Sequence, residues 1–292
     1  MKIRLGTRKS NLALKQTEIV KAELLQIDPS LLFATQEIIT TGDINLESNL
    51  YESGGKGLFL KEIEQALLND EIDIAIHSLK DVPAILPAGL ELCAVLRRED
   101  PRDVFVSKKY SSIWELPLNA VVGTSSPRRK VQLLQMRPDL TIVNFRGNIN
   151  TRLDKIERSE VDATVLALAG LKRLSLERNF LAFEVDEMLP AIGQGAICIE
   201  KKITNKAFDH LLLQINDAHT QVEVQAERRF MQLFGASCNT PIAAYAQTRG
   251  NKLLFKTMYH DPARSKTFYS QQTGYISESL QLAEQAFKLF TH

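Results

Sequence analysis

The sequence predicts an α/β protein in which two α/β units are followed by a small α+β region. Strand-like and helix-like segments alternate twice along the chain, which is the pattern of βαβ units on a largely parallel sheet. The chain has 292 residues, which exceeds the size at which a single core usually stops growing. From about Asp217 onward, the alternation gives way to a helix and a run of strands.

The first unit is predicted from five consecutive segments. In the helical segments apolar residues recur every three or four positions, whereas the strand segments are short and apolar. The predicted order is a strand at 2–7, a helix at 12–27, a strand at 33–40, a helix at 58–70 and a buried strand that begins at Ile72.

The second unit follows a charged segment, Arg97–Arg102, which contains Pro101 and is predicted to be a crossover. A return crossover is predicted in Met188–Glu200, whose apolar strand would rejoin the first sheet. The elements predicted between them are a strand at Ala120–Gly123, a helix from Pro127, a strand at Thr141–Phe145, a helix at Asn148–Ile156 and a strand at Ala163–Ala167.

Chain length and these segments predict two or three domains. Domain 1 is expected at 1–97 with a return segment at 191–214, domain 2 at 98–190, and a C-terminal domain at 215–292. Within the last, the sequence predicts a helix at 221–234, strands near 242–247, 253–259 and 267–272, and a final helix from Ser277.

Composition excludes several classes of protein. Thirty-six basic and thirty-five acidic residues give a formal charge of +1, so no global field attracts nucleic acid or an anionic membrane. The amino terminus carries charges throughout, and no segment reaches membrane-spanning length, so a soluble cytoplasmic protein is expected. The three cysteines show no CxxC spacing, which predicts neither a disulfide framework nor a metal site.

Polar side chains cluster where the predicted parallel strands end, which is where ligands bind in open α/β sheets. In "GTSSPRRK", Pro127 suits the first position of a helix, and one of the three preceding hydroxyl residues would be its cap. The residues that follow the strands are Thr7, Arg8 and Ser10, then His77, Ser78, Lys80 and Asp81, then Thr124, Ser125, Ser126, Arg128 and Arg129, and then Arg146, Gly147 and Asn148.

Two arginines in the first turn of a helix oppose its dipole unless an anion lies between them. Arg128 and Arg129 therefore indicate a ligand, and Arg8, Arg146 and Arg152 also lie at or just beyond element ends. Because arginine grips planar carboxylates with two hydrogen bonds, we expect an organic polyanion with several carboxylates. The alternatives are solvated surface charges, or nucleic acid, against which the absence of interleaved aromatic residues argues.

Three side chains have a functional and a structural interpretation. Asp81, at the end of a buried strand, is a candidate for holding and moving protons, and otherwise a cap or a partner of Lys80. His77 is expected to be a satisfied core or supporting residue. Lys56 in "GGKGLF" is a weak anion-binding candidate that lacks the ending of a phosphate-binding loop.

The cysteines differ in their surroundings. Cys93 and Cys198 lie in apolar strand-like runs, where cysteine behaves as a small hydrophobe. Cys238 lies in "LFGASCNTPIAAYA", between a helix and a strand. An accessible thiol in such a loop can bond covalently to a prosthetic group, with an inert thiol as the alternative.

Taken together, these motifs resemble the porphobilinogen deaminase family, also called hydroxymethylbilane synthases. The resemblance runs in order along nearly the whole chain through "LGTRKSNLAL", "GGKGLF", "IAIHSLKDVP", "DPRDVFVS", "VGTSSPRRKVQL", "FRGNINTRLDK", "DATVLALAGLKRL", "PAIGQGAICIE" and "CNTPIAAYA". It implies two domains folded like a type II periplasmic binding protein around a cleft, plus a C-terminal domain that carries the cofactor cysteine. It also implies a cytoplasmic, monomeric transferase of haem-type tetrapyrrole biosynthesis, with no nucleic acid or membrane partner and no metal.

The resemblance further implies a reaction and a role for each site residue. Four porphobilinogen molecules would be joined head to tail into hydroxymethylbilane, with release of ammonia, on a dipyrromethane cofactor bound through a thioether to Cys238. Asp81 would assist loss of ammonia, stabilise cationic intermediates and help deprotonate the joined ring. Cofactor contacts would come from Lys80, Asp81, Thr124, Ser125, Ser126, Arg128, Arg129, Arg146 and Gly147, and substrate contacts from Arg8, Ser10, Lys56, Phe59, Ser78, Arg146, Arg152 and Gln194.

Three positions depart from the pattern of the family. Ala236-Ser237 replaces the usual Gly-Gly before the cysteine, Glu52 replaces a basic residue, and Asn11 replaces a proline. Because glycine permits positive φ, the first change bears on the loop backbone. Two alternatives to an active deaminase follow, namely a binding protein that holds a carboxylate ligand without chemistry and a family member that no longer loads its cofactor.

Overall fold

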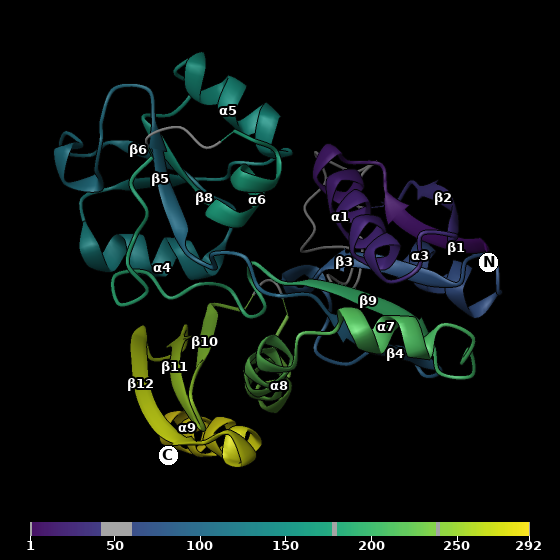
Figure 1. The fold of residues 1–292 in the computed structure, drawn as a ribbon. Coiled ribbons are helices and arrows are strands. Elements are labelled where there is room, and N and C mark those ends of the chain that lie inside the picture. Colours follow the sequence, from purple (N-terminus) through teal and green to yellow (C-terminus); the bar gives the residue numbers. More distant parts are fainter. Residues whose placement is uncertain (1, 42–59, 177–179, 238–239, 292) are drawn as a thin grey trace.

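A computed structural model describes residues 2–41, 60–176, 180–237 and 240–291. Two α/β units lie side by side, and a smaller region packs below them (Figure 1). The predicted fold class is confirmed, because two mixed sheets are followed by an antiparallel sheet with helices.

The first sheet has five strands in the order β2-β1-β3-β9-β4. β1 runs parallel to β2 and β3, whereas β9 runs antiparallel to β3 and β4. Helices α1, α3 and α7 belong to this unit (Figure 1). The bounds are β1 Lys2–Arg8, α1 Asn11–Ile27, β2 Leu32–Ile38, α3 Lys61–Leu68, β3 Ile74–Ser78, β4 Leu90–Val95, β9 Ile197–Lys202 and α7 Asp209–Ile215.

The second sheet has four strands in the order β5-β8-β6-β7, with β5 antiparallel to β8 and the other pairs parallel. Its helices are α4, α5 and α6. The bounds are β5 Asp103–Ser107, β6 Val121–Gly123, α4 Pro127–Met136, β7 Thr141–Val143, α5 Ile149–Glu157, β8 Ala163–Ala167 and α6 Leu168–Arg173.

The C-terminal region is an antiparallel sheet in the order β10-β11-β12, covered by two helices. One of these, α8, lies between this sheet and the first unit (Figure 1). The bounds are α8 Ala218–Leu233, β10 Ile242–Arg249, β11 Lys252–Asp261, β12 Lys266–Tyr275 and α9 Ser279–Thr291.

Alternation along the strands places one face of the first sheet against α1 and α7. Ile74 and Ile76 of β3 and Ile197 and Ile199 of β9 point to the same core, as the period of two along a strand requires. Val20 is among the α1 residues that face them. Burial of such side chains, about 1.5–3 kcal/mol each, holds the strand ends in place.

The two crossovers between the α/β units meet at a buried ion pair. Arg98 Nη1 donates to Glu227 Oε1 of α8 at 2.6 Å, and Arg98 Nε donates to the carbonyl of Gln194 at 2.8 Å. Glu227 also accepts from the backbone N–H of Gly193 at 2.7 Å and of Ala246 at 2.9 Å. One carboxylate therefore ties the outgoing crossover, the return crossover, α8 and the C-terminal sheet together.

Neither a membrane-spanning helix nor a metal site is found in the described ranges. No helix there is long and apolar enough to cross a bilayer. In the same ranges, no group of three or more histidine, cysteine, aspartate or glutamate side chains is arranged to hold a metal ion.

Candidate active site

Asp81 lies in a short 3-10 turn, Leu79–Asp81, that follows the carboxyl end of β3. The turn is held by the backbone N–H of Leu79, which donates to Ala196 O at 3.0 Å, and by that of Val82, which donates to Leu79 O at 3.1 Å. Within the described residues, the Asp81 side chain has neither a hydrogen bond nor an ion pair, so its structural alternative, a cap or a salt bridge to Lys80, is not found there. Its carboxylate is available to a ligand.

Asp81 forms part of the lining of a pocket at the end of the first sheet. This pocket lies between β1, β3 and the start of α1, and its polar lining residues are Arg8, Ser10, Gln16, His77, Ser78 and Asp81. Four of the predicted site residues, Arg8, Ser10, Ser78 and Asp81, are thus brought together here.

Ser10 and Ser78 are fixed by hydrogen bonds to neighbouring elements. Ser10 is the N-cap of α1, and its Oγ accepts from Ala13 N at 3.3 Å. Ser78 Oγ accepts from Gln16 Nε2 at 2.7 Å. Sequence reasoning missed Gln16, and the signal was a polar residue on the buried face of α1, beside Thr17 and Val20.

His77 lines the pocket and also belongs to a buried group of titratable side chains, which confirms the prediction of a satisfied core or supporting histidine. Its Nε2 lies 3.0 Å from Glu200 Oε2 of β9. Glu64 of α3 is also buried, and neither Glu64 Oε1 nor Glu200 Oε1 has a hydrogen-bond partner among the residues that the structure describes. Burial, and then the charge of Glu200, raises the pKa of Glu64 to about 7.

The raised pKa of Glu64 predicts a specific dependence of stability on pH. Between its unfolded pKa of 4.5 and its folded pKa of about 7, the folded protein holds a proton that the unfolded chain has lost. The contribution of Glu64 to the free energy of unfolding is therefore fully present below pH 4.5. It decreases as pH rises from 4.5 and is lost once pH has passed 7. In the native protein we expect Glu64 to lower the free energy of unfolding by roughly 1–3 kcal/mol between pH 4.5 and 7. Glu64→Gln should not show this decrease, and denaturant unfolding at several pH values measures it.

Glu62 on the same helix is the matched control. Burial raises the pKa of Glu62, but hydrogen bonds from Thr41 outweigh it and lower that pKa. Glu62→Gln should therefore leave the decline between pH 4.5 and 7 in place. Equal pH slopes for the native protein and Glu64→Gln would show that Glu64 does not titrate in this window.

The second unit contributes the hydroxyl and arginine residues that precede and open α4. Ser126 is the cap, its Oγ accepting from Arg129 N at 3.4 Å. Thr124 Oγ1 accepts from Ser126 N at 3.2 Å. Ser125 Oγ donates to Asn144 Oδ1 and accepts from Phe145 N, so it joins this turn to the end of β7.

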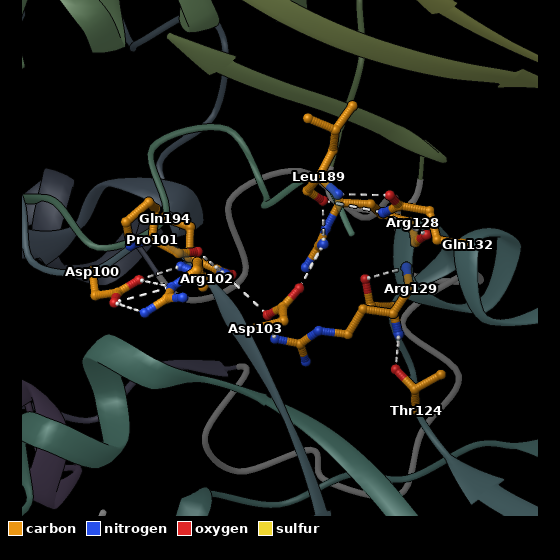
Figure 2. A network of polar contacts seen from close by, with 11 residues as sticks. Asp100, Pro101, Arg102, Asp103, Thr124, Arg128, Arg129, Gln132, Leu189 and Gln194 are labelled. Carbon is orange, nitrogen blue, oxygen red and sulfur yellow. Dashed lines mark hydrogen bonds and ion pairs between the residues drawn. The ribbon is translucent and has the colours of Figure 1, made fainter. Parts of the chain in front are cut away.

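The anion between Arg128 and Arg129 belongs to the chain itself, which corrects the inference that this pair by itself indicates a ligand. Arg128 Nη1 donates to Asp103 Oδ2 and Arg129 Nη2 to Asp103 Oδ1, each at 2.7 Å. Figure 2 shows Asp103 at the centre of this network. Burial alone raises the pKa of Asp103, but the two guanidiniums outweigh it and bring that pKa well below its usual range. Asp103 neutralises one of the two positive charges and offsets the unfavourable helix dipole.

Asp103 also holds Gln194 of the return crossover. Gln194 Nε2 donates to Asp103 Oδ1 at 2.9 Å and to Pro101 O at 2.6 Å (Figure 2). The Gln194 side chain is fully buried, and in the described part of the chain its Oε1 has no hydrogen-bond partner. Sequence reasoning did not single out Asp103. The signal was a carboxylate at the first position of an apolar strand, where a charge requires a partner.

Arg146, Gly147 and Arg152 lie at the turn before α5 and at its start. Gly147 has φ +122°, and a Cβ atom there would lie 2.8 Å from the Thr151 side chain, so glycine is required. Arg152 Nε donates to Gly147 O at 2.8 Å. Burial, then repulsion from Arg129, lowers the pKa of Arg152 to about 10, and Asp81 partly offsets this shift.

The electrostatic neighbours of Lys80 join the two units into one cluster. Burial lowers the pKa of Lys80; Asp81 and Asp103 raise it, whereas Arg129 and Arg128 lower it further. Five cations and two carboxylates of this cluster thus influence one another across the edge between the sheets. The excess of positive charge in a chain of formal charge +1 is local, as the sequence predicts.

Several predicted positions lie outside the described residues, namely Glu52, Lys56, Phe59 and Cys238. The approach to Cys238 is described as far as Ser237. Gly235 has φ +56°, whereas neither Ala236 nor Ser237 has a positive φ. The glycines that these two residues replace are therefore not required for positive φ at those positions.

The other two cysteines are structural, as predicted. Cys198 is buried, and Cys93 is partly buried. Burial raises the pKa of Cys93 to about 12 and raises that of Cys198 as well, so both remain thiols rather than nucleophilic thiolates at neutral pH.

A cluster in which cations outnumber carboxylates, at the edge between two α/β sheets, is typical of a protein that binds an organic polyanion. Residues 3–210 match the family model "Porphobilinogen deaminase, dipyromethane cofactor binding domain", and residues 221–290 match "Porphobilinogen deaminase, C-terminal domain". The chain belongs to the porphobilinogen deaminase family.

Curated relatives agree along nearly the full length. Porphobilinogen deaminase of Orientia tsutsugamushi (strain Boryong) is 48% identical over 296 residues, covering 99% of this chain and 98% of the relative. That of Rickettsia bellii (strain OSU 85-389) is 47% identical over 281 residues, covering 90% of this chain and 94% of the relative.

Similarity to solved structures concerns the fold alone. A putative methionine-binding lipoprotein of Bacillus subtilis is 14% identical with a TM-score of 0.46, covering 75% of this chain and 92% of that chain. The BvgS VFT2 domain of Bordetella pertussis is 15% identical with a TM-score of 0.43, covering 74% of this chain and 85% of that chain.

Proposed function

We propose that this protein joins four porphobilinogen molecules head to tail on a covalently bound dipyrromethane primer, releasing four ammonia molecules. One water then cleaves the bond between the tetrapyrrole and the primer and supplies the hydroxyl group of the product, hydroxymethylbilane. The observation that carries the proposal is the cluster in which Lys80 and Arg152 lie near Asp81, while Arg128 and Arg129 are held beside them by Asp103. Each pyrrole unit adds an acetate and a propionate, so a growing chain gathers carboxylates that require such cations. A monomeric state and a cytoplasmic location are part of the proposal and rest on the family.

Orphaned polar atoms in the cluster fit the dipyrromethane group. Within the described residues, Arg129 Nε is a buried donor without an acceptor, and Gln194 Oε1 is a buried acceptor without a donor. The Lys80 ammonium likewise has no hydrogen bond to a described residue. Carboxylates would satisfy the donors and pyrrole N–H groups the acceptor, because buried polar groups are rarely left unpaired.

The residues would divide the binding between primer and substrate. When bound, the primer supplies the nucleophilic pyrrole carbon at which the chain grows. Asp103 holds Arg128 and Arg129 in place through one N–H donor of each. Their other N–H donors would bind the carboxylates of the primer. The proposed primer contacts are Lys80, Asp81, Thr124, Ser125, Ser126, Arg128, Arg129, Arg146 and Gly147, with Cys238 as the attachment; the proposed substrate contacts are Arg8, Ser10, Lys56, Phe59, Ser78, Arg146, Arg152 and Gln194.

Asp81 would carry the proton and charge chemistry. In each condensation the bond from the aminomethyl carbon to nitrogen breaks, a carbon–carbon bond forms, and the ring carbon loses one proton, which balances as release of one ammonium ion. A carboxylate without internal partners stabilises the cationic substrate as ammonia leaves and then accepts the ring proton. Lys80 and the arginines hold the carboxylates of the pyrroles and keep them away from Asp81.

Replacing the predicted attachment residue tests the proposal. We expect Cys238→Ser to lack the pyrrole adduct and to lose nearly all conversion of porphobilinogen, measured as ammonia and hydroxymethylbilane formed per substrate consumed. Cys93→Ser is the matched control, because its thiol donates to Ile199 O at 3.3 Å and neither residue is among those that line the pocket. Normal conversion by Cys238→Ser would refute the covalent primer, and binding of porphobilinogen without conversion by the native protein would favour a binding protein.

A further inference from the structure

Arg228 of α8 is a buried arginine whose side chain, among the described residues, donates hydrogen bonds only to the backbone of the first unit. Its Nη2 donates to Pro83 O at 2.8 Å and to Ala84 O at 3.3 Å, and its Nη1 donates to Val82 O at 3.3 Å. Only 9% of the residue is exposed. Within the described part of the chain, it forms no ion pair with a carboxylate.

Burying the Arg228 guanidinium against carbonyls is less favourable than burying an apolar side chain at the same position. The Arg228 guanidinium exchanges water for neutral carbonyls and has no paired counter-ion among the described residues, and the charge of Glu200 offsets its desolvation only in part. An apolar side chain of similar length would fill the same space at lower cost. One helical turn further on, Gln232 Nε2 donates to Ala84 O at 3.0 Å. Two polar side chains on one face of α8 therefore converge on the same three-residue segment, which points to a requirement for a fixed backbone there.

The segment that they hold follows Asp81 directly. No hydrogen bond from a described residue orients the Asp81 carboxylate, so its direction is set by the backbone of the turn and of the residues after it. Pro83 restricts Val82 to an extended conformation, and the Val82 N–H donates back to Leu79 O at 3.1 Å. Fixing the carbonyls of residues 82–84 therefore fixes Asp81.

The carboxyl end of α8, which carries Arg228 and Gln232, leads to the loop that contains Cys238. After Leu233, the N–H of Gly235 donates to Gln232 O at 2.9 Å and that of Ala236 to Met231 O at 3.0 Å. The same helix thus contacts the segment after Asp81 and forms the base of that loop. Because a helix is rigid over this length, α8 keeps a fixed distance between the segment after Asp81 and the base of the loop that contains Cys238.

We propose that Arg228, assisted by Gln232, is a positioning residue that fixes the Asp81 carboxylate relative to the base of the loop that carries the attachment cysteine. This inference rests on the proposed function, in which Asp81 acts on a chain anchored at Cys238. Arg228 does not contact the pocket, so it acts only through Asp81. Displacement of a catalytic group by about 1 Å costs on the order of 100-fold in rate.

The test compares Arg228→Met with the native protein in steady-state kinetics. We expect kcat to fall about 10- to 100-fold while KM changes less than about threefold, and we expect intact mass to show the same adduct as in the native protein. Arg228→Lys, which keeps a donor for one carbonyl, should recover part of kcat. Arg229→Met is the control, because Arg229 pairs with Glu284 at 2.5 Å and does not contact residues 82–84.

Two outcomes would overturn the inference. Native kcat in Arg228→Met, even with a lower unfolding temperature, would show that the side chain only packs α8 against the first unit. If Arg228→Met does not fold, Gln232→Met removes one hydrogen bond to Ala84 O, and an unchanged kcat in that variant would have the same meaning. A native protein with neither adduct nor turnover would instead refute the proposed function itself.

Discussion

Replacing Asp81 by alanine should abolish nearly all turnover while the fold and the pyrrole adduct are retained. The side chain is half-buried and makes no hydrogen bond or ion pair within the described residues, so its loss removes little native-state contact energy. Its charge, however, is what balances Lys80 and Arg152 next to the cationic substrate. We expect kcat to fall by roughly 10²- to 10⁴-fold, measured as hydroxymethylbilane formation under saturating porphobilinogen.

Two further variants separate charge from position. Asp81→Asn keeps the shape but not the carboxylate, and we expect it to be nearly as slow as Asp81→Ala. Glu23→Ala removes a carboxylate from the exposed face of α1 and should behave as the native protein. Turnover within about threefold of native for Asp81→Asn would mean that the carboxylate is not the acting group.

Replacing Arg98 by methionine should cause the largest loss of stability. Arg98 and Glu227 are 7% and 0% exposed at their side chains, so the variant leaves a buried carboxylate without its cation. Such an uncompensated charge costs about 3–5 kcal/mol, which corresponds to a decrease of roughly 10 °C in the midpoint of thermal unfolding. The measurement is calorimetry of the native protein and the variant under identical cofactor loading.

A salt bridge at the surface of the same crossover provides the comparison. Lys172 pairs with Glu99 at 2.8 Å with both side chains about 40% exposed, so Lys172→Met should cost less than about 1 kcal/mol. Arg98→Met combined with Glu227→Leu should recover part of the loss, because no buried charge then remains. Similar effects of Arg98→Met and Lys172→Met would show that the buried pair does not tie the crossovers together.

Local periodicity was sufficient to predict most elements of the fold. The segments predicted as strands and helices have counterparts at shifted ends; the strand predicted at Thr141–Phe145, for example, ends at Val143. Local sequence also left the cap of α4 open among three hydroxyl residues, and Ser126 takes this role because its Oγ reaches Arg129 N. The domain boundaries remain a prediction.

Long-range partners were not predictable from the sequence. Arg128 and Arg129 are separated from Asp103 by 25 and 26 positions, and no local pattern indicates that this carboxylate lies between them. Arg228 contacts carbonyls that lie about 145 positions earlier in the chain. Such pairs depend on how the sheets and crossovers pack, so sequence reasoning located the charged cluster but not the network that holds it.

The intact mass of the purified protein, with peptide mapping of any adduct, tests the central claim most directly. The proposed function predicts an addition equal to two linked pyrrole units on the peptide that contains Cys238. An unmodified chain that also fails to acquire the adduct from porphobilinogen or from preformed hydroxymethylbilane would contradict it, and would indicate a cleft that binds carboxylates without polymerising them.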